Sequence, residues 1–151
     1  MLVIVGDGPE REELAQFAAS VGCRSRVHFL GHRSDAAQLS AQFDVFCLPS
    51  AFEGMSNSLM DAMAAGVPVV VSDIPSNTEL VEDGVTGLVC PVGECADFCR
   101  AAKRLLDDRQ CASELSTTAQ DLMRERFSVE NMIGDHLRMY EDVCSRADNG
   151  G

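Results

Sequence analysis

Five short apolar runs constrain the fold of this chain more than any other feature of its sequence. They have little polar alternation, as expected for β-strands buried on both faces of a sheet. They recur at intervals of roughly 20 residues with helical patterns between them, which predicts right-handed crossovers and an α/β fold with a doubly wound parallel sheet of about five strands. The runs are LVIV at 2–5, VHFL at 27–30, VFCL at 45–48, PVVVS at 68–72 and GLVC at 87–90.

Helical patterns fill the segments between the runs and the chain that follows them. Ser56 is a favourable cap for one helix, and Ser76 with Glu79 forms a capping box for a shorter one. A helical tail follows the last run, and we expect disorder at 146–151. The predicted helices are 10–22 with an apolar stripe of Leu14, Phe17, Ala18 and Val21, then 35–43, 56–65, a turn or two from 76, 94–107, 110–126 and 128–145.

Composition bounds the class of protein. The 151 residues are enough for one hydrophobic core, so residues 1–145 are predicted to form a single domain. The chain has 24 acidic residues against 12 Lys and Arg, which gives a net charge of -12. It lacks the clustered cations that bind the nucleic-acid backbone, so we expect no nucleic-acid partner. No apolar run reaches the length of a membrane span and no secretory leader is recognisable, so we expect no transmembrane segment and a cytoplasmic location.

The cysteines suggest neither a disulfide framework nor a metal site. There are seven, they include no CxxC pair, and no histidine lies close to them in sequence. An odd number of cysteines without such spacing indicates free thiols. We therefore expect no bound metal ion.

The stretch SAFEGMSNSLMDAMAAGVPVVVSD, residues 50–73, is the strongest candidate for a ligand site. Glu53 precedes a predicted helix and Asp61 lies within it. The first amides of that helix, around 57–59, lack intrahelical acceptors and favour a phosphate group without any lysine. Gly54 removes a side chain where a ligand or the backbone approaches closely.

Each of these features also has an ordinary structural explanation. Asp61 can interact with the helix dipole, and Glu53 can be a solvated loop acid. Alternatively, Asp61 can accept hydrogen bonds from the two hydroxyls of a ribose. The segment GDGPER at 6–11 is an incomplete dinucleotide fingerprint, because Arg11 stands where a third glycine is expected. A tight turn and a ligand contact at Gly6 and Gly8 both remain open.

These motifs together resemble the retaining, nucleotide-sugar-dependent glycosyltransferases of the GT-B fold, the group 1 or family-4 type, and specifically their E-x7-E region. The resemblance covers nearly the whole chain in the order of the family's motifs. The matching segments are GDGPERE at 6–12, VHFLGH at 27–32, DVFCLPS at 44–50, SAFEGMSNSLMDAMAAGVPVV at 50–70, TELVEDGVTGLVCP at 78–91 and FSVENM at 127–132.

The resemblance implies a role for each residue of the donor site. Glu53 would be the catalytic residue that contacts the donor sugar and stabilises its developing charge. Asp61 stands in place of the family's second glutamate, one methylene shorter, and would bind the ribose hydroxyls. Glu79 would either cap a helix or contact the ligand. The other expected donor-binding residues are Gly54, Met55, Ser56, Asn57 and Ser58 around the diphosphate, Gly31, His32 and Arg33 beside the base, and Gly6 and Gly8.

The resemblance also implies what would accompany this chain. No metal cofactor is needed, and the substrate would be a nucleotide sugar. An N-terminal acceptor domain, and a first strand and helix of this domain, would precede residue 1, so we expect the isolated chain to be inactive. The whole enzyme would be cytoplasmic, with peripheral membrane association left open.

Without that first strand, the strands at 2–5 and 45–48 would have open edges. We expect them either to pair with each other or to contact another chain, for example in a homodimer. Two other functions stay open: a non-catalytic nucleotide-binding module, and an assembly fragment that pairs with a separate partner chain.

Overall fold

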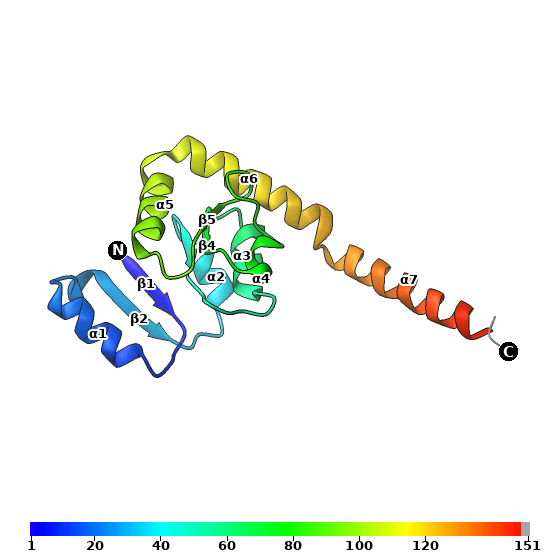
Figure 1. The fold of residues 1–151 in the computed structure, drawn as a ribbon, viewed down its shortest axis with the longest axis horizontal. Helices are drawn as coiled ribbons and strands as arrows, with labels where there is room; N and C mark the ends of the chain where they lie inside the picture. The colour runs from blue at the N-terminus through cyan, green and yellow to red at the C-terminus, as the bar shows by residue number, and fades with distance from the viewer. Residues whose placement is uncertain (149–151) are drawn as a thin grey trace. The chain divides into compact units, whose positions relative to one another are not determined.

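In the computed structural model, residues 1–148 are described, and they form two compact units (Figure 1). The first unit comprises residues 1–39 and the second begins at Ser40. The elements of the first unit are β1 (Leu2–Val5), α1 (Arg11–Ser20), a 3-10 turn (Arg24–Arg26) and β2 (Val27–Gly31), and α2 (Ala36–Ser40) crosses the boundary. The second unit contains β3 (Phe46–Leu48), α3 (Asn57–Ala64), β4 (Val69–Ser72), α4 (Pro75–Thr78), β5 (Leu88–Cys90), α5 (Cys95–Asp107), α6 (Arg109–Arg126) and α7 (Val129–Asp148).

The first unit is a parallel β-α-β arrangement. Leu2 of β1 lies opposite Val27 of β2, and the register shifts between Ile4 and Val5. Gly31 ends β2 with a φ of 67°, a left-handed conformation that suits glycine, and its carbonyl accepts a hydrogen bond of 2.8 Å from the Gly6 amide. The loop after β1 and the end of β2 are therefore tied together.

The second unit is built on a three-stranded parallel sheet in the order β3-β4-β5. β4 lies in the middle and all of its residues are buried. Because side chains alternate along a strand, Val69 and Val71 enter one apolar cluster while Val70 enters the other. Helices α3 and α6 contribute to the first cluster, and α5 with the beginning of α6 contributes to the second.

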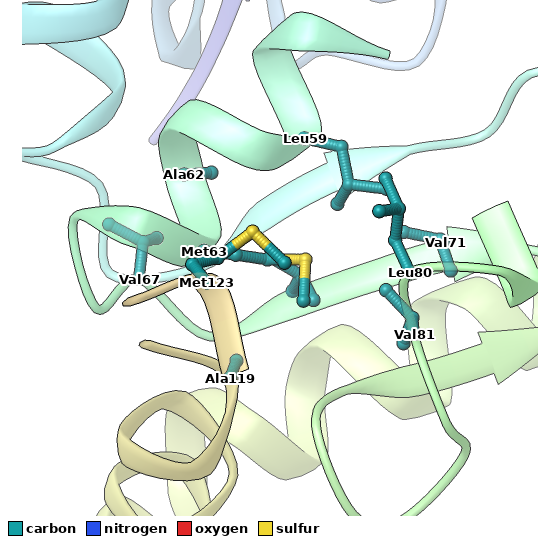
Figure 2. Close-up of a cluster of buried hydrophobic side chains, with 10 residues drawn as sticks. Leu59, Ala62, Met63, Val67, Val71, Leu80, Val81, Ala119 and Met123 are labelled. Carbon is teal, nitrogen blue, oxygen red and sulfur yellow. The ribbon is translucent and has the colours of Figure 1, made fainter. Parts of the chain in front are cut away.

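The larger cluster fixes the position of α3. Figure 2 shows Met63 of α3 beside Met123 of α6 within it. Gly66 ends the helix with a φ of 74°, and the Gln120 side chain of α6 donates a hydrogen bond of 2.9 Å to the free carbonyl of Ala64. The helix is thus held along its length by packing and at its C-terminus by a polar contact. The cluster contains Leu59, Ala62, Met63, Val67, Val69, Val71, Leu80, Val81, Ala119 and Met123.

The structure confirms the α/β class, all five strands and the helical C-terminal part. Complete burial holds for β4, and β5 is buried or half-buried throughout. β1, β2 and β3 each contain exposed residues, so the expected burial on both faces does not hold for them. The direct pairing of the strands at 2–5 and 45–48 is not found among residues 1–148, where β1 and β3 belong to different sheets. Contact of these edges with another chain stays a prediction.

Three helix predictions need correction. The helix expected at 35–43 is the shorter α2. On α1, Ala18 is buried, but Leu14, Phe17 and Val21 of the expected apolar stripe are exposed. α7 extends to Asp148, beyond the expected end at 145, so the first three residues of the predicted disordered tail are helical. The other three, 149–151, lie outside the described residues.

The predicted capping box is wrong. α4 begins after Ile74 with Pro75 at its first position, where the fixed φ of proline favours a helix start. Ser76 is therefore inside the helix and its hydroxyl caps nothing. Glu79 lies at the C-terminal end of α4 instead.

Candidate functional site

The candidate site lies at residues 49–61, where β3 ends and α3 begins. β3 is parallel to β4, so this segment stands at the carboxyl edge of the three-stranded sheet. Ligands of open α/β sheets bind at that edge. Glu53 and Asp61 therefore lie in a segment at this edge, and their role in binding a ligand stays a prediction.

Glu53 is half-buried in the loop before α3. The Ser50 hydroxyl donates a hydrogen bond of 2.9 Å to its Oε1 atom. A hydrogen bond to a charged group is stronger than one between neutral groups, and it restricts the side-chain rotamers of both residues. Glu53 is thus oriented by its own loop, unlike an acid that is free in solvent.

The N-terminus of α3 has unused hydrogen-bond donors. Ser56 is the cap residue, and its buried hydroxyl accepts from the Leu59 amide at 3.4 Å while its carbonyl accepts from Met60. The Leu59 amide, expected to be free, is therefore satisfied. The amides of residues 54–58 donate to no acceptor within residues 1–148. These donors, with the helix dipole, are suited to an anion.

Asp61 lies on the solvent face of α3. Leu59, Ala62 and Met63 are fully buried on the core side of the helix, whereas Asn57 and Asp61 are exposed. Residues four apart are neighbours on a helix surface, so Asp61 stands one turn beyond Asn57. Its carboxylate has no hydrogen-bond partner among residues 1–148. This position is compatible both with a solvated surface acid and with a ligand contact.

Gly54 is not required by the packing of the protein itself. A Cβ atom built on Gly54 meets nothing within 4 Å, and the residue lacks a positive φ. Close approach by the backbone, one of the two explanations from the sequence, is therefore excluded. The neighbouring Met55 is 59% exposed. The loop surface at Gly54 and Met55 is open.

A buried polar network lies behind the loop. Asn77 and Ser72 are almost completely inaccessible. The Asn77 side chain donates to the Ser72 carbonyl at 3.0 Å and to its hydroxyl at 3.2 Å. The Ser72 hydroxyl in turn donates to the carbonyls of Ser50 and of Leu48, the latter at 3.4 Å. Sequence reasoning missed these residues, although a serine directly after the buried VVV run was a signal for a polar group at the carboxyl edge.

The remaining predicted site residues belong to the first unit. Arg33 forms a two-point contact with Asp35, at 2.7 and 2.6 Å, and His32 is exposed. The hydrogen bonds from Arg33 lower the pKa of Asp35. Gly31 is buried and is joined to Gly6 as described above. The contacts of Gly31 and Arg33 described here all lie within the first unit.

The GDGPER segment forms a tight turn. The Asp7 carboxylate accepts from the Gly8 amide at 2.9 Å and from Arg11 at 3.0 Å. Arg11 also donates to the Phe29 carbonyl at 3.3 Å. The arginine at the position of the third glycine therefore braces the turn against β2. Ligand contact at Gly6 and Gly8 stays a prediction.

A cavity of about 870 Å³ in the second unit is separate from the loop. It is lined by residues of the segment 73–91, including Glu79, and by the C-terminal half of α6. Neither Glu53 nor Asp61 is among the described residues that line it. Within residues 1–148, no group of three or more His, Cys, Asp or Glu side chains is arranged to hold a metal ion. No helix in the same range combines the length and apolar character needed to cross a membrane.

Comparison with known proteins gives concordant results. The sequence matches the family described as Glycosyl transferases group 1 over residues 1–108. It is 32% identical to the N-acetyl-alpha-D-glucosaminyl L-malate synthase of Bacillus anthracis over 149 residues, which cover 99% of this chain and 39% of that protein. The chain thus spans about two fifths of the length of this relative.

Solved structures of other proteins share the fold of this chain. The Anabaena HepE structure in complex with UDP-glucose aligns with a TM-score of 0.84 and 31% identity, covering 95% of this chain and 40% of that one. The C-terminal domain of the group 1 protein LpcC from Francisella tularensis shares the fold, with a TM-score of 0.76 and 18% identity over 84% of this chain and 69% of that one. The family match runs from β1 through α5 and includes both Glu53 and Asp61, so this chain belongs to the group 1 glycosyltransferases, and it corresponds to their C-terminal domain.

Proposed function

We propose that this chain binds a nucleoside diphosphate sugar, as the donor-binding part of a retaining glycosyltransferase. The observation that carries the proposal is the start of α3, where unsatisfied amides at Asn57 and Ser58 stand between Glu53 and Asp61. In a member of this family, such an arrangement offers the amides for the diphosphate, Asp61 for the ribose and Glu53 for the sugar. The UDP-glucose in the HepE structure supports a ligand of this class.

The diphosphate would be bound by main-chain groups. The amides of Gly54, Met55, Ser56, Asn57 and Ser58 are available, and the helix dipole adds partial positive charge. These donors need no lysine and no metal ion, so a metal-free site is part of the proposal. They would also stabilise the charge that develops on the diphosphate as it leaves.

Asp61 and Glu53 would bind the donor on opposite sides of its diphosphate. Asp61, exposed one turn into α3, would accept hydrogen bonds from the ribose hydroxyls. Glu53 would contact the sugar and stabilise the positive charge that develops at its anomeric carbon. Gly31, His32 and Arg33 would border the base, and Gly6 and Gly8 would complete the donor contacts; these five residues are proposed on the family resemblance.

Sugar transfer would require more than this chain. The first two relatives that it matches are about two and a half times as long as this chain, since the chain covers 39–41% of them. We propose that an N-terminal domain, or a partner chain, supplies the acceptor site, because transfer needs the acceptor hydroxyl beside the anomeric carbon. Homodimer formation through the strand edges and a cytoplasmic location also stay proposals. The seven free cysteines are compatible with a reducing compartment.

Thermal unfolding with and without nucleotide tests donor binding. We expect UDP or UDP-glucose, at about 100 times the dissociation constant, to raise the Tm by about 5 °C or more. Asp61→Ala should lose this protection, because the ribose contact is removed. Glu114→Ala, which removes an exposed acid from α6, is the matched control and should keep it. If neither these ligands nor the corresponding ADP and GDP compounds protect the native chain, the proposed function is wrong.

A further inference from the structure

We propose that Ser72 and Asn77 are positioning residues that hold the loop carrying Glu53 in its sugar-binding geometry. This inference rests on the proposed function. It assigns a role to two residues of β4 and α4 that lie outside the donor site itself and do not touch the expected ligand.

The chemistry of the network fixes the direction of each hydrogen bond. A backbone carbonyl can only accept, so the Asn77 group that lies 3.0 Å from the Ser72 carbonyl must be the NH2 group. The same NH2 group lies 3.2 Å from the Ser72 hydroxyl, which therefore acts as an acceptor toward Asn77. The single hydroxyl proton of Ser72 is then directed at the main chain of the loop, chiefly at the Ser50 carbonyl and secondarily at that of Leu48.

The network continues to Glu53 through one residue. Ser72 binds the carbonyl of Ser50, and the hydroxyl of the same Ser50 binds the Glu53 carboxylate at 2.9 Å. The orientation of Glu53 is thus linked to two residues that are 0% and 1% exposed. Because these residues are packed in the core, they have little freedom to move.

The network begins where the pairing of β3 with β4 stops. Leu48 lies opposite Val71 in the last pair of these two strands, so Ser72, which still pairs with Cys90 of β5, is the first residue of β4 without a partner in β3. Beyond that point the Ser72 hydroxyl connects β4 to the chain that follows β3, through its hydrogen bonds to the carbonyls of Leu48 and Ser50. Among residues 1–148, the other hydrogen bonds of the loop from Pro49 to Ser56 lie within the loop or at the start of α3.

The incomplete satisfaction of Asn77 supports a specific role over a merely structural one. Its Oδ1 atom is buried and has no hydrogen-bond partner among residues 1–148. A buried unpaired acceptor is costly, and an apolar residue of similar size would avoid that cost. Asparagine is nevertheless present, and the group that it does use is the one that orients Ser72.

The prediction is a change in ligand preference and not a general loss of binding. In the proposed site Glu53 is the loop residue that contacts the sugar. The nucleotide is contacted by the loop amides of 54–56 and also by the amides and Asp61 of α3, which lie outside the loop. Disordering the loop should therefore weaken both ligands, but UDP-glucose more than UDP, because UDP keeps its contacts with α3. A general structural defect would weaken both ligands in proportion.

Isothermal titration calorimetry with UDP and UDP-glucose on the full chain measures this preference. In Ser72→Ala we expect the ratio of the two affinities to fall about five- to tenfold, the size of one lost hydrogen bond. Ser72→Thr, which keeps the hydroxyl, should restore most of the ratio. Ser116→Ala is the matched control, since Ser116 is a buried serine of α6 that donates to a carbonyl, that of Ser113, at 3.3 Å. If Ser72→Ala does not fold, Ser50→Ala removes the last link of the network at a half-buried position.

NMR relaxation of the ligand-free, ¹⁵N-labelled chain gives a second, independent measurement. Backbone order parameters of residues 50–56 should be lower in Ser72→Ala than in Ser116→Ala, with residues of α5 serving as the internal reference. An unchanged affinity ratio with unchanged order parameters would overturn the inference while leaving donor binding intact. Failure of the native chain to bind either nucleotide would instead overturn the proposed function, and the sugar-positioning role with it.

Discussion

The Ser50 hydroxyl donates a hydrogen bond of 2.9 Å to the Glu53 carboxylate, so the acid expected to meet the sugar is oriented before any ligand arrives. Glutamine at position 53 keeps the shape and one acceptor oxygen but removes the charge. We expect Glu53→Gln to leave the free energy of unfolding within about 0.5 kcal/mol of the native value.

The same substitution should weaken UDP-glucose binding and leave UDP binding unchanged, as measured by calorimetry. Glu94→Gln, at an exposed acid before α5, is the control and should change neither. Equal weakening of both ligands in Glu53→Gln would show that Glu53 does not discriminate the sugar.

The length of the side chain at position 61 can be tested directly. Asp61 is exposed on α3, so a longer acid fits without disturbing the core. We expect Asp61→Glu to retain UDP binding and Asp61→Asn to weaken it by about tenfold, because a neutral amide is a poorer acceptor for two hydroxyls. Fluorescence or calorimetric titration with UDP measures both. Unchanged affinity in Asp61→Asn would assign Asp61 to the solvated surface.

Two glycines should respond in opposite ways to alanine. A Cβ atom on Gly87 would lie 2.6 Å from Val69 Cγ2 and 2.8 Å from Val81 Cγ1, whereas one on Gly54 meets nothing within 4 Å. We expect Gly87→Ala to lower the free energy of unfolding by about 1–3 kcal/mol through overpacking, and Gly54→Ala to leave it nearly unchanged. Urea denaturation measures both.

The two variants should differ in the opposite sense in their affinity for UDP: the variant that is nearly as stable as the native chain should bind more weakly. Gly54→Ala places a methyl group on the surface where the diphosphate is proposed to approach, so its affinity for UDP should fall. Folded Gly87→Ala should bind UDP as the native chain does. Full UDP affinity in Gly54→Ala would argue against close approach at this loop.

The pair of Arg33 and Asp35 predicts a pH dependence in the first unit. Hydrogen bonds from Arg33 lower the pKa of Asp35, so the folded pKa lies below the unfolded value of about 3.9. The stabilisation is therefore complete above the unfolded pKa and is lost as the pH falls through the folded one. Because both side chains are exposed, the effect on stability is small.

Titration of the Asp35 carboxyl carbon by NMR measures this effect. Arg33→Ala should raise the pKa of Asp35 toward its ordinary value. In the control Arg24→Ala it should not change, because the Arg24 guanidinium contacts the Val27 carbonyl and, within residues 1–148, forms no ion pair with a carboxylate. An unchanged pKa of Asp35 in Arg33→Ala would mean that the pair does not persist in solution.

Local sequence signals predicted much of the fold. The run VVVS defined β4, and the Ser56 cap with Gly66 defined both ends of α3 within a residue. The start of α4 was misjudged because Ser76 and Glu79 have the spacing of a capping box, while the preference of Pro75 for the first helical position decided the outcome. The exposure of Phe17 could not be predicted, because an apolar stripe reports amphipathic character and not what covers it.

The candidate site was predictable only in part, for a related reason. Glu53, Gly54 and Asp61 lie within one continuous stretch, so spacing alone suggested their arrangement. The contact from Ser72 to Ser50 joins residues 22 positions apart that meet through the parallel pairing of β3 and β4. Such a network depends on register, which a single sequence does not specify.

Residue-specific NMR of the amides at the start of α3 tests the central claim most directly. Titration of the ¹⁵N-labelled chain with UDP-glucose should perturb the amide signals of Asn57 and Ser58 most strongly, together with neighbours from Glu53 to Asp61. Phosphate bound at these donors would shift their proton resonances in a saturable manner, with the same dissociation constant that calorimetry gives. Saturable shifts confined to other parts of the chain, or no shifts at all, would contradict the account.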